Sequence, residues 1–333
     1  MIAYYIHHHG SGHLHRARAI AARSRTPVIG LSSAQRPADW PGRWIRLADD
    51  AGADPATDDV TANGTLHWAP RHHGGLRERM SAVSQVLADG ARVLVSDVSV
   101  EVALLARLHG VPVVIMAQPG SRTDRPHRLA YDLAARLLAP WPRRPQPDWP
   151  TRWLAKTVHL GGLSRFDGRR PEPARATGRV LAMWGSGGLD VTPVHLRAAA
   201  AATPDWAWTV LGPEPVDAAA NLRWAGWVAD PWDALAAAEV VVTHGGQNAV
   251  AEVAAARRAA VVIPQDRPFA EQRATAAALL RDRLALVAPR WPIPDRWPDL
   301  LRRARERGGA RWAHWSPGNG AARAAAELDA LAT

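Results

Sequence analysis

The sequence predicts an α/β protein made of two doubly wound, Rossmann-like domains. Three observations carry this prediction. The chain has 333 residues, enough for two domains of about 150 residues each. Short apolar runs with the length of buried strands alternate with Ala-rich helical segments. In each half of the chain, one such run ends in a glycine turn that leads into a helix, a rhythm typical of parallel sheets with right-handed crossovers.

Composition and charge indicate a globular chain and exclude several classes of protein. Hydrophobic residues make up 47% of the sequence, and no apolar run approaches the roughly 20 residues that cross a membrane. The chain has no Cys, which excludes disulfides and thiolate chemistry, and its N-terminus lacks a signal-peptide pattern. We therefore expect a cytoplasmic protein.

The formal net charge is +10 and comes almost wholly from arginine, since Lys156 is the only lysine. Two interpretations stay open: a solvated basic surface, or attraction to nucleotide diphosphates, anionic lipid or nucleic acid. The sequence has no zinc-finger spacing, RNP-type motif or basic helix with heptads. We therefore expect no specific binding of nucleic acid.

A glycine turn in the second half favours phosphate binding. Residues 240–243 have the composition of a buried strand, Gly245 and Gly246 interrupt it, and Asn248 opens a helical segment. Free backbone N–H groups and the helix dipole attract an anion there, and glycine allows a diphosphate to approach closely. His244 would then stand beside the anion. Glycine turns of this kind also occur without phosphate, so a purely structural turn remains the alternative.

The same segment resembles the donor-binding region of UDP-glycosyltransferases and their relatives with a family-28-type C-terminal domain, a group that includes the peptidoglycan N-acetylglucosaminyltransferases. The resemblance implies the GT-B architecture, in which two doubly wound, Rossmann-like domains face a central cleft. This sequence departs from the family pattern at Gln247, where tryptophan is frequent, and at Ala249, where serine is frequent. The matching positions are His244, Gly246, Asn248, Glu252, Pro264, Phe269, Glu271 and Gln272.

The resemblance implies a role for each part of the second domain. Glu252 is expected to hold the ribose hydroxyls, and Glu271 with Gln272 the sugar hydroxyls. Trp227 and Val228 are expected to pack on the base, with a core position as the alternative for Trp227. The donor diphosphate is expected to contact His244, Gly245, Gly246, Gln247 and Asn248, together with a second glycine turn at Ser186 and Gly187.

The first half begins with a strand at residues 2–6, a glycine turn and a helix. Gly10-x-Gly12-His13 resembles the N-terminal motif of the same superfamily. The resemblance implies that Gly12 lies at the donor and that His13 is the general base for an acceptor hydroxyl, a task that suits imidazole. A helix-capping or loop-packing role is the alternative for His13. Because Arg16 follows, the motif also resembles the opening of nucleotide-sugar hydrolases of this fold.

Asp97 follows the predicted strand at residues 92–96. In plant and bacterial UDP-glycosyltransferases a matching aspartate hydrogen-bonds the catalytic histidine, and the local sequence here is similar. Both loops end strands of one sheet, so His13 and Asp97 are expected to meet at its carboxyl edge. A cap of the following helix is the alternative for Asp97.

Residues 122–139 predict a helix, and residues 141–153 follow as a proline-rich segment that holds Trp141, Trp149 and Trp153. This segment is either an ordinary loop or a membrane-interface patch through which the enzyme meets a lipid-linked acceptor, peripherally at the inner face of the membrane. Metal binding is not expected at the run His7-His8-His9, because consecutive strand residues point to opposite faces and no carboxylate lies close in the sequence.

We predict an acceptor-side domain at residues 1–160 with a C-terminal helix at 319–333 packed on it, a linker at 161–178, and a donor-binding domain at 179–318. The resemblance implies an inverting, metal-independent glycosyltransferase that needs no cofactor. It would move a sugar from a nucleoside diphosphate sugar, expected to be a UDP-sugar, to a hydroxyl of a cell-envelope intermediate or a natural product. A nucleotide-sugar hydrolase, an epimerase and a non-catalytic nucleotide-binding module are the alternatives.

Overall fold

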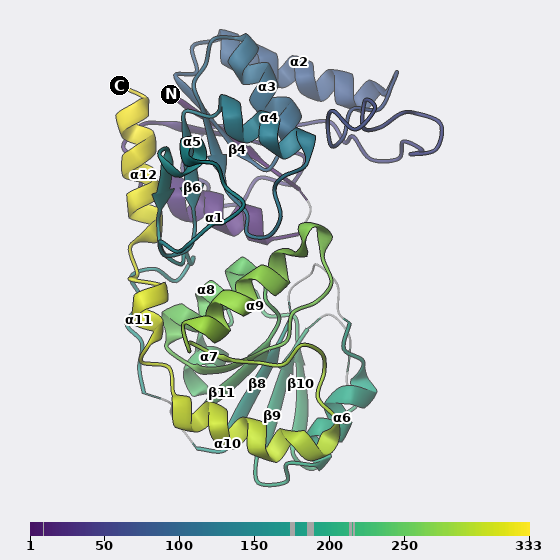
Figure 1. Ribbon diagram of the computed structural model, residues 1–333, viewed down its shortest axis with the longest axis vertical. Coiled ribbons are helices and arrows are strands. Elements are labelled where there is room, and N and C mark those ends of the chain that lie inside the picture. The colour runs from purple at the N-terminus through teal and green to yellow at the C-terminus, as the bar shows by residue number, and fades with distance from the viewer. Residues whose placement is uncertain (9, 174–176, 185–189, 213–214, 216) are drawn as a thin grey trace. The chain divides into compact units, whose positions relative to one another are not determined.

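The computed structural model describes residues 1–333 except for 9, 174–176, 185–189, 213–214 and 216 (Figure 1). The chain divides into two compact units. Unit 1 comprises Met1–Leu160 and Gly320–Thr333, and unit 2 comprises Gly161–Asn319. Each unit contains one parallel sheet with its own helices, which confirms the prediction of two Rossmann-like domains.

The sheet of unit 1 has seven strands in the order β3-β2-β1-β4-β5-β6-β7. Their apolar, β-branched composition suits strands buried on both faces of a parallel sheet, and β1, β2, β4 and β5 are buried throughout. The strands are β1 (Ile2–Ile6), β2 (Val28–Ser32), β3 (Trp44–Arg46), β4 (Val93–Asp97), β5 (Val113–Met116), β6 (Arg136–Ala139) and β7 (Thr157–His159).

The helices of unit 1 form two groups, as a doubly wound sheet requires. One group packs in sequence, α2 on α3, α3 on α4 and α4 on α5, and in the other group α12 packs on α1. Figure 1 shows α2, α3 and α4 side by side. The helices are α1 (Gly12–Ala21), α2 (Gly74–Ala88), α3 (Val100–Leu108), α4 (Arg125–Leu133), α5 (Thr151–Leu154) and α12 (Gly320–Leu331).

The prediction of one helix over residues 122–139 was wrong. Helix α4 ends at Leu133, and residues 136–139 form strand β6 between β5 and β7. Leu137, Leu138 and Ala139 are fully buried there. Charged residues at helical spacing suggested a continuous helix, but burial of this apolar run in the sheet outweighs the local helix propensity.

Of the two interpretations of residues 141–153, the membrane-interface patch loses its aromatic basis in the structure. Trp141, Trp149 and Trp153 are only 1%, 6% and 1% exposed. Trp149 and Trp153 make edge-to-face contacts with Tyr131, and Trp141 makes one with Trp149. The tryptophans of this segment therefore belong to the core of unit 1 and present no aromatic surface to a membrane.

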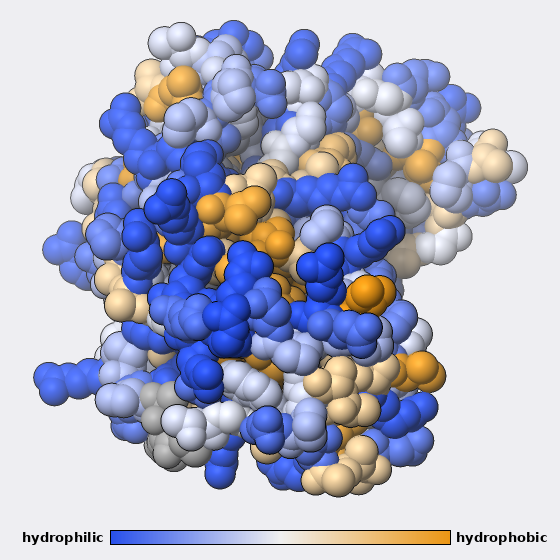
Figure 2. Space-filling model, turned by 60° about the horizontal axis from the view of Figure 1, so that its bottom comes forward, coloured by the Kyte–Doolittle hydropathy of each residue, from blue (hydrophilic) through white to orange (hydrophobic). Residues whose placement is uncertain are grey.

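Within the described residues, none of the helices combines the length and the apolar character needed to cross a membrane. Hydrophilic residues predominate on the face drawn in Figure 2, where hydrophobic residues show as separate groups. This face agrees with the arginine-rich composition and its formal net charge of +10.

The sheet of unit 2 has six strands in the order β10-β9-β8-β11-β12-β13. Val240 and Val242 of the central strand β11 are fully buried, and Trp208 and Trp297 pack edge to face in the same core. The strands are β8 (Arg179–Met183), β9 (Ala207–Leu211), β10 (Leu222–Gly226), β11 (Val240–Thr243), β12 (Ala259–Val262) and β13 (Leu286–Val287). The α-helices are α6 (Pro193–Ala201), α7 (Trp232–Ala237), α8 (Gln247–Ala256), α9 (Glu271–Arg281), α10 (Trp297–Arg307) and α11 (Trp312–Trp315).

Asp329 of α12 ties the C-terminal helix to the turn before β2. Its carboxylate accepts hydrogen bonds from the Ser24 hydroxyl at 2.7 Å and from the backbone N–H groups of Arg25 and Thr26 at 3.0 and 2.9 Å. Burial raises the pKa of Asp329, but these hydrogen bonds outweigh it and lower the pKa to about 2. Because the folded-state pKa is depressed, the stabilisation is present at neutral pH and is lost as the pH falls from about 4 towards 2.

We expect Asp329→Asn to lower the free energy of unfolding at pH 7 by about 1–3 kcal/mol, since neutral hydrogen bonds replace charge-assisted ones. Urea denaturation at pH 7 and at pH 3 measures this effect, which must be smaller at pH 3. Glu327→Gln is the matched control, because Glu327 lies on the same helix and only approaches Arg136 at 4.0 Å. Equal stability of Asp329→Asn and the wild type at pH 7 would contradict the assignment.

Candidate active site

His13 and Asp97 lie together at the carboxyl edge of the unit 1 sheet. His13 is in the first turn of α1 after β1, and Asp97 ends the adjacent strand β4, where it pairs in register with Ile6. His13 Nδ1 lies 2.8 Å from Asp97 Oδ1. The His13 side chain is 23% exposed, whereas Asp97 is fully buried. Since Asp97 engages Nδ1, the ring atom left for proton transfer is Nε2.

Arg16 contacts both oxygens of the Asp97 carboxylate, and its Nη2 lies 3.2 Å from His13 Nδ1. Its Nε donates to Asp97 Oδ2 at 2.9 Å and its Nη2 to Oδ1 at 2.5 Å, and Arg16 itself is only 2% exposed. Burial raises the pKa of Asp97, but Arg16 and His13 outweigh it and lower the pKa to about 2. Asp97 is therefore an ionised, fixed acceptor for the imidazole of His13. In the sequence, Arg16 only makes the motif resemble that of nucleotide-sugar hydrolases, and its contact with Asp97 was not predicted.

The capping alternatives for both residues are wrong. Helix α1 has Ser11 at its N-cap, with no side-chain hydrogen bond there. Helix α3 is capped by Ser99, whose hydroxyl accepts from the Val102 N–H at 3.2 Å. The carboxylate of Asp97 contacts His13 and Arg16 instead.

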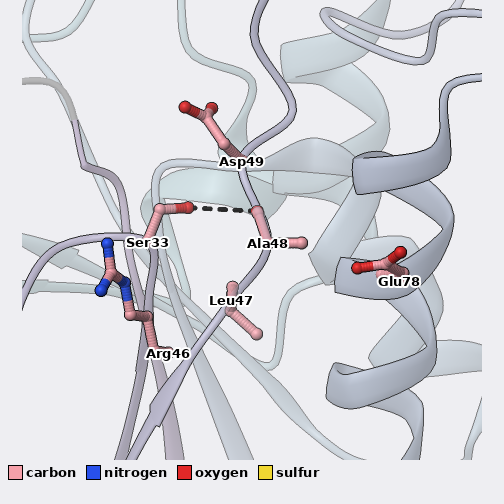
Figure 3. A pocket seen from close by; sticks show the side chains of 6 residues that line it. All are labelled: Ser33, Arg46, Leu47, Ala48, Asp49 and Glu78. Atoms are coloured by element: carbon pink, nitrogen blue, oxygen red, sulfur yellow. Dashed lines mark hydrogen bonds between the residues drawn. The ribbon is translucent and has the colours of Figure 1, made fainter.

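A pocket of about 450 Å³ opens at the carboxyl ends of β2 and β3. In Figure 3 the Asp49 carboxylate and the Arg46 guanidinium lie on the Ser33 side of the loop, and the Glu78 carboxylate lies on the other side, on its helix. The pocket is lined by Ser33, Arg46, Leu47, Ala48, Asp49 and Glu78.

Two histidine rings connect this pocket with the dyad. The ring of His7 lies 5.8 Å from that of His13, and His8 stacks on His7 at 4.9 Å. A ring nitrogen of His8 in turn lies within 4.8 Å of a carboxylate oxygen of Asp49. The pocket and the dyad therefore share one edge of the unit 1 sheet.

The glycine turn of unit 2 leads from β11 into α8, with Gly246 at the N-cap. Gly246 has no side chain to cap this helix, and a helix N-terminus of this kind favours an anion. The N–H of Gly246 donates to His244 Nδ1 at 3.0 Å, which places the ring proton of neutral His244 on Nε2. Burial and then Arg267 lower the pKa of His244 to about 4, so His244 is neutral at pH 7. Gln247 and Asn248 open the helix.

Gln272 joins the turn to the loop before α9. Its side-chain oxygen accepts from the N–H groups of Gly245 and Gln265, each at 3.0 Å, and the side chain is buried. The Gln272 side chain also hydrogen-bonds with His244, so it orders the turn from several sides. Phe269 and Ala270 have φ angles of 60° and 54°, which turn the chain so that Glu271 begins α9.

Glu252 has a partner that its sequence position does not reveal. Its Oε1 accepts from Arg165 Nε at 2.8 Å, and Arg165 also donates to the Ala229 carbonyl at 2.6 Å. Burial raises the pKa of Glu252 even though Arg165 opposes this. A ribose at Glu252 would share the carboxylate with Arg165. The separation of 87 residues explains why no local pattern pointed to Arg165.

The remaining predicted donor residues are only partly placed. Trp227 and Val228 follow β10 and are 53% and 38% exposed, so the alternative of a core tryptophan is wrong. Gly12 is the first residue of α1. Ser186 and Gly187 lie outside the described residues.

Gly245 has no room for a side chain. A Cβ atom there would lie 2.7 Å from the backbone oxygen of Gln272 and 3.1 Å from its Cβ. We expect Gly245→Ala to cost about 1–3 kcal/mol of stability through overpacking and to weaken nucleotide binding by displacing the turn.

Thermal melts and nucleotide titration measure both effects of Gly245→Ala. Gly74→Ala at the first turn of α2 is the control, because a Cβ atom there meets nothing within 4 Å. If Gly245→Ala melts and binds as the wild type does, the turn is not fixed as described.

The sequence indicated no metal site, but within the described residues the structure brings two sets of three metal-ligating side chains together. One set is His67, Asp124 and His127; the other is His8 with Asp49 and Asp50. In the second set Asp50 is paired with the buried Arg79 at 2.9 Å. Both sets combine residues far apart in the chain, so their spacing gave no signal.

The comparisons with known proteins concern the fold and a segment of unit 2. Residues 228–290 match the model of the glycosyltransferase family 28 C-terminal domain. No curated protein matches the chain in sequence.

Solved glycosyltransferase structures share the fold over the whole chain. The glycotransferase of kitacinnamycin has a TM-score of 0.71 at 19% identity, with 99% of this chain and 98% of that chain covered. The calicheamicin glycosyltransferase CalG4 has a TM-score of 0.67 at 18% identity, with 99% of this chain and 98% of that chain covered. MurG of Acinetobacter baumannii has a TM-score of 0.63 at 18% identity, with 99% of each chain covered. The chain therefore has the GT-B fold of these glycosyltransferases, and its residues 228–290 match the glycosyltransferase family 28 C-terminal domain.

Proposed function

We propose that the protein is an inverting glycosyltransferase that moves a sugar from a UDP-sugar to an acceptor hydroxyl. The family match and the GT-B fold support glycosyl transfer in general. The observation that carries the finer proposal is the His13–Asp97 contact of 2.8 Å, with Asp97 fixed by Arg16. This arrangement leaves a partly exposed imidazole nitrogen backed by a buried carboxylate.

In the proposed reaction His13 Nε2 takes the proton of the acceptor hydroxyl. The hydroxyl oxygen attacks the anomeric carbon from the face opposite UDP, so one C–O bond forms as the bond to the diphosphate breaks. UDP leaves with the electron pair, and the anomeric configuration inverts. Asp97 stabilises the imidazolium that forms on His13, and the proton then passes to solvent.

Unit 2 supplies groups suited to the donor. The first N–H groups of α8, its dipole and the Nε2–H of His244 would stabilise the diphosphate as its charge develops. This set provides for departure of the diphosphate without a metal ion or another cofactor. Glu252 and Glu271 would accept from ribose and sugar hydroxyls, and the exposed ring of Trp227 would stack on uracil.

The pocket at Asp49 and Glu78 is the candidate acceptor site of unit 1. Two carboxylates and the guanidinium of Arg46 line it, so it suits a polar acceptor rich in hydroxyl or amino groups. A cell-envelope intermediate and a glycosylated natural product both offer such groups. Its connection to His13 through His7 and His8 supports this assignment.

A donor panel followed by an acceptor panel tests the proposal. UDP- and dTDP-sugars are first screened for thermal stabilisation, and UDP release is then measured with and without natural-product aglycones and a cell-envelope lipid fraction. We expect UDP-sugars to stabilise the protein and UDP release to depend on an acceptor. Rapid UDP release from donor alone would indicate a hydrolase, and donor conversion without UDP loss an epimerase. Nucleotide binding without any turnover would indicate a binding module.

A further inference from the structure

We propose that His67, Asp124 and His127 of unit 1 bind a divalent transition-metal ion, with Zn²⁺ as the ion to test. The potential ligand atoms of these residues all lie within 4.8 Å of one another. His67 Nε2 lies 3.0 Å from Asp124 Oδ2, and His127 Nδ1 lies 2.5 Å from Asp124 Oδ1. An ion among them could therefore reach two imidazole nitrogens and a carboxylate after small side-chain movements.

The backbone already fixes the three side chains near one another. The N–H groups of His67 and Trp68 donate to Glu101 Oε1 at 2.8 and 3.1 Å, which holds the His67 loop against α3. Asp124 and His127 lie in the first turn of α4, three residues apart and thus on one helix face. Binding of an ion would therefore cost little conformational entropy of the backbone.

Asp124 is used in an unusual way for its position. It is the N-cap residue of α4, where an aspartate commonly accepts a hydrogen bond from the helix N–H groups. Its side chain makes no such cap bond and is directed to the two histidines instead. Helix α4 therefore lacks the side-chain cap that Asp124 could provide, and the Asp124 carboxylate contacts both imidazole rings, where it can bind a cation.

The ligand types indicate which ion fits. Two imidazoles and one carboxylate, without thiolate, suit Zn²⁺ and neighbouring first-row ions better than Ca²⁺ or Mg²⁺. The side chains of His67 and Asp124 are 34% and 32% exposed, which leaves room for water at a fourth position. Arg122 Nη1 lies 3.4 Å from His127 Nε2, and its charge opposes the ion. We therefore expect micromolar affinity rather than the tighter binding of structural zinc sites.

The other set of ligating residues provides an internal comparison. Asp49 and Asp50 approach His8, but Asp50 is engaged by Arg79 at 2.9 Å. Removing His8 should therefore leave metal binding almost unchanged. This inference concerns a site in unit 1 and does not depend on the proposed sugar transfer.

The test titrates Zn²⁺ into full-length, chelator-treated protein from which any affinity tag has been removed, by calorimetry at pH 7.5. We expect one ion per chain with a Kd of about 1–10 µM, or about −8 to −7 kcal/mol. His127→Ala and His67→Ala should each weaken binding by at least about tenfold. His8→Ala and the exposed His314→Ala should bind as the wild type does. Circular dichroism confirms that each variant is folded.

Co²⁺ provides a second measurement on the wild-type protein alone. Bound Co²⁺ with nitrogen and oxygen ligands in a low-coordinate site should give visible absorption stronger than that of the aqueous ion, and excess Zn²⁺ should remove it. Absence of Zn²⁺ binding below about 1 mM, a Co²⁺ spectrum like that of the free ion, or unchanged binding in a folded His127→Ala variant would each overturn the proposal.

Discussion

Replacing His13 with alanine is expected to lower kcat for sugar transfer by about 10²–10⁴-fold, the usual contribution of a positioned general base. The reason is that His13 Nε2 is the group proposed to take the acceptor proton, with Nδ1 held by Asp97 at 2.8 Å. Donor affinity should change little, because the predicted diphosphate contacts lie in unit 2. Steady-state UDP release and a separate nucleotide titration measure the two effects independently.

His109→Ala is the matched control for this experiment. His109 is exposed at the C-terminal end of α3 and contacts Ser84. Its replacement should leave kcat within about twofold of the wild type, since it lies outside the proposed chemistry. Retention of full activity by a folded His13→Ala variant would rule out the base assignment.

Asp97→Asn should reduce kcat by a similar factor, about 10²–10⁴-fold, because a neutral amide neither stabilises the imidazolium nor fixes the productive tautomer of His13. It should also lower the free energy of unfolding by about 3–5 kcal/mol, since the buried Arg16 would lose its counter-charge. Activity assays and urea denaturation at pH 7 measure these losses.

The pH dependence of this variant has a definite sign. The pKa of Asp97 is depressed to about 2, so its stabilising contribution is complete above about pH 5 and fades as the pH falls towards 2. The stability difference between Asp97→Asn and the wild type should therefore be constant from pH 5 to 8 and shrink at lower pH. A double variant that also replaces Arg16 with Met should recover part of the lost stability but not the activity. Recovery of activity would show that Asp97 only balances Arg16.

The alternation of apolar runs and helices was sufficient to predict the two sheets. Val240 to Thr243 is a clear example, since a short β-branched run before two glycines has few other interpretations. Local patterns failed where burial decided the outcome. Residues 136–139 continue a helical charge pattern, yet they pair with β5 and β7 because their apolar side chains fill the sheet. Likewise Trp149 looks like a surface residue among prolines and is buried against Tyr131.

The candidate site was predictable only where its residues lie next to strand ends. His13 and Asp97 follow adjacent strands of one sheet, so topology alone brings them together. Contacts between side chains that are far apart in the sequence could not be predicted from it. Arg165 meets Glu252 across 87 residues, and His67 meets Asp124 across 57. No periodicity or motif spans such separations, so these contacts required the structure.

Binding of the donor diphosphate at the N-terminus of α8 is tested most directly by amide hydrogen exchange with and without saturating UDP. We predict slower exchange at the N–H groups of Gln247, Asn248 and Ala249, which form the first turn of the helix. The Gly74–Ala88 helix α2, which begins with an unrelated loop, should exchange at the same rate in both samples. Protection confined to other segments of the chain, or none at saturating UDP, would contradict donor binding at this turn.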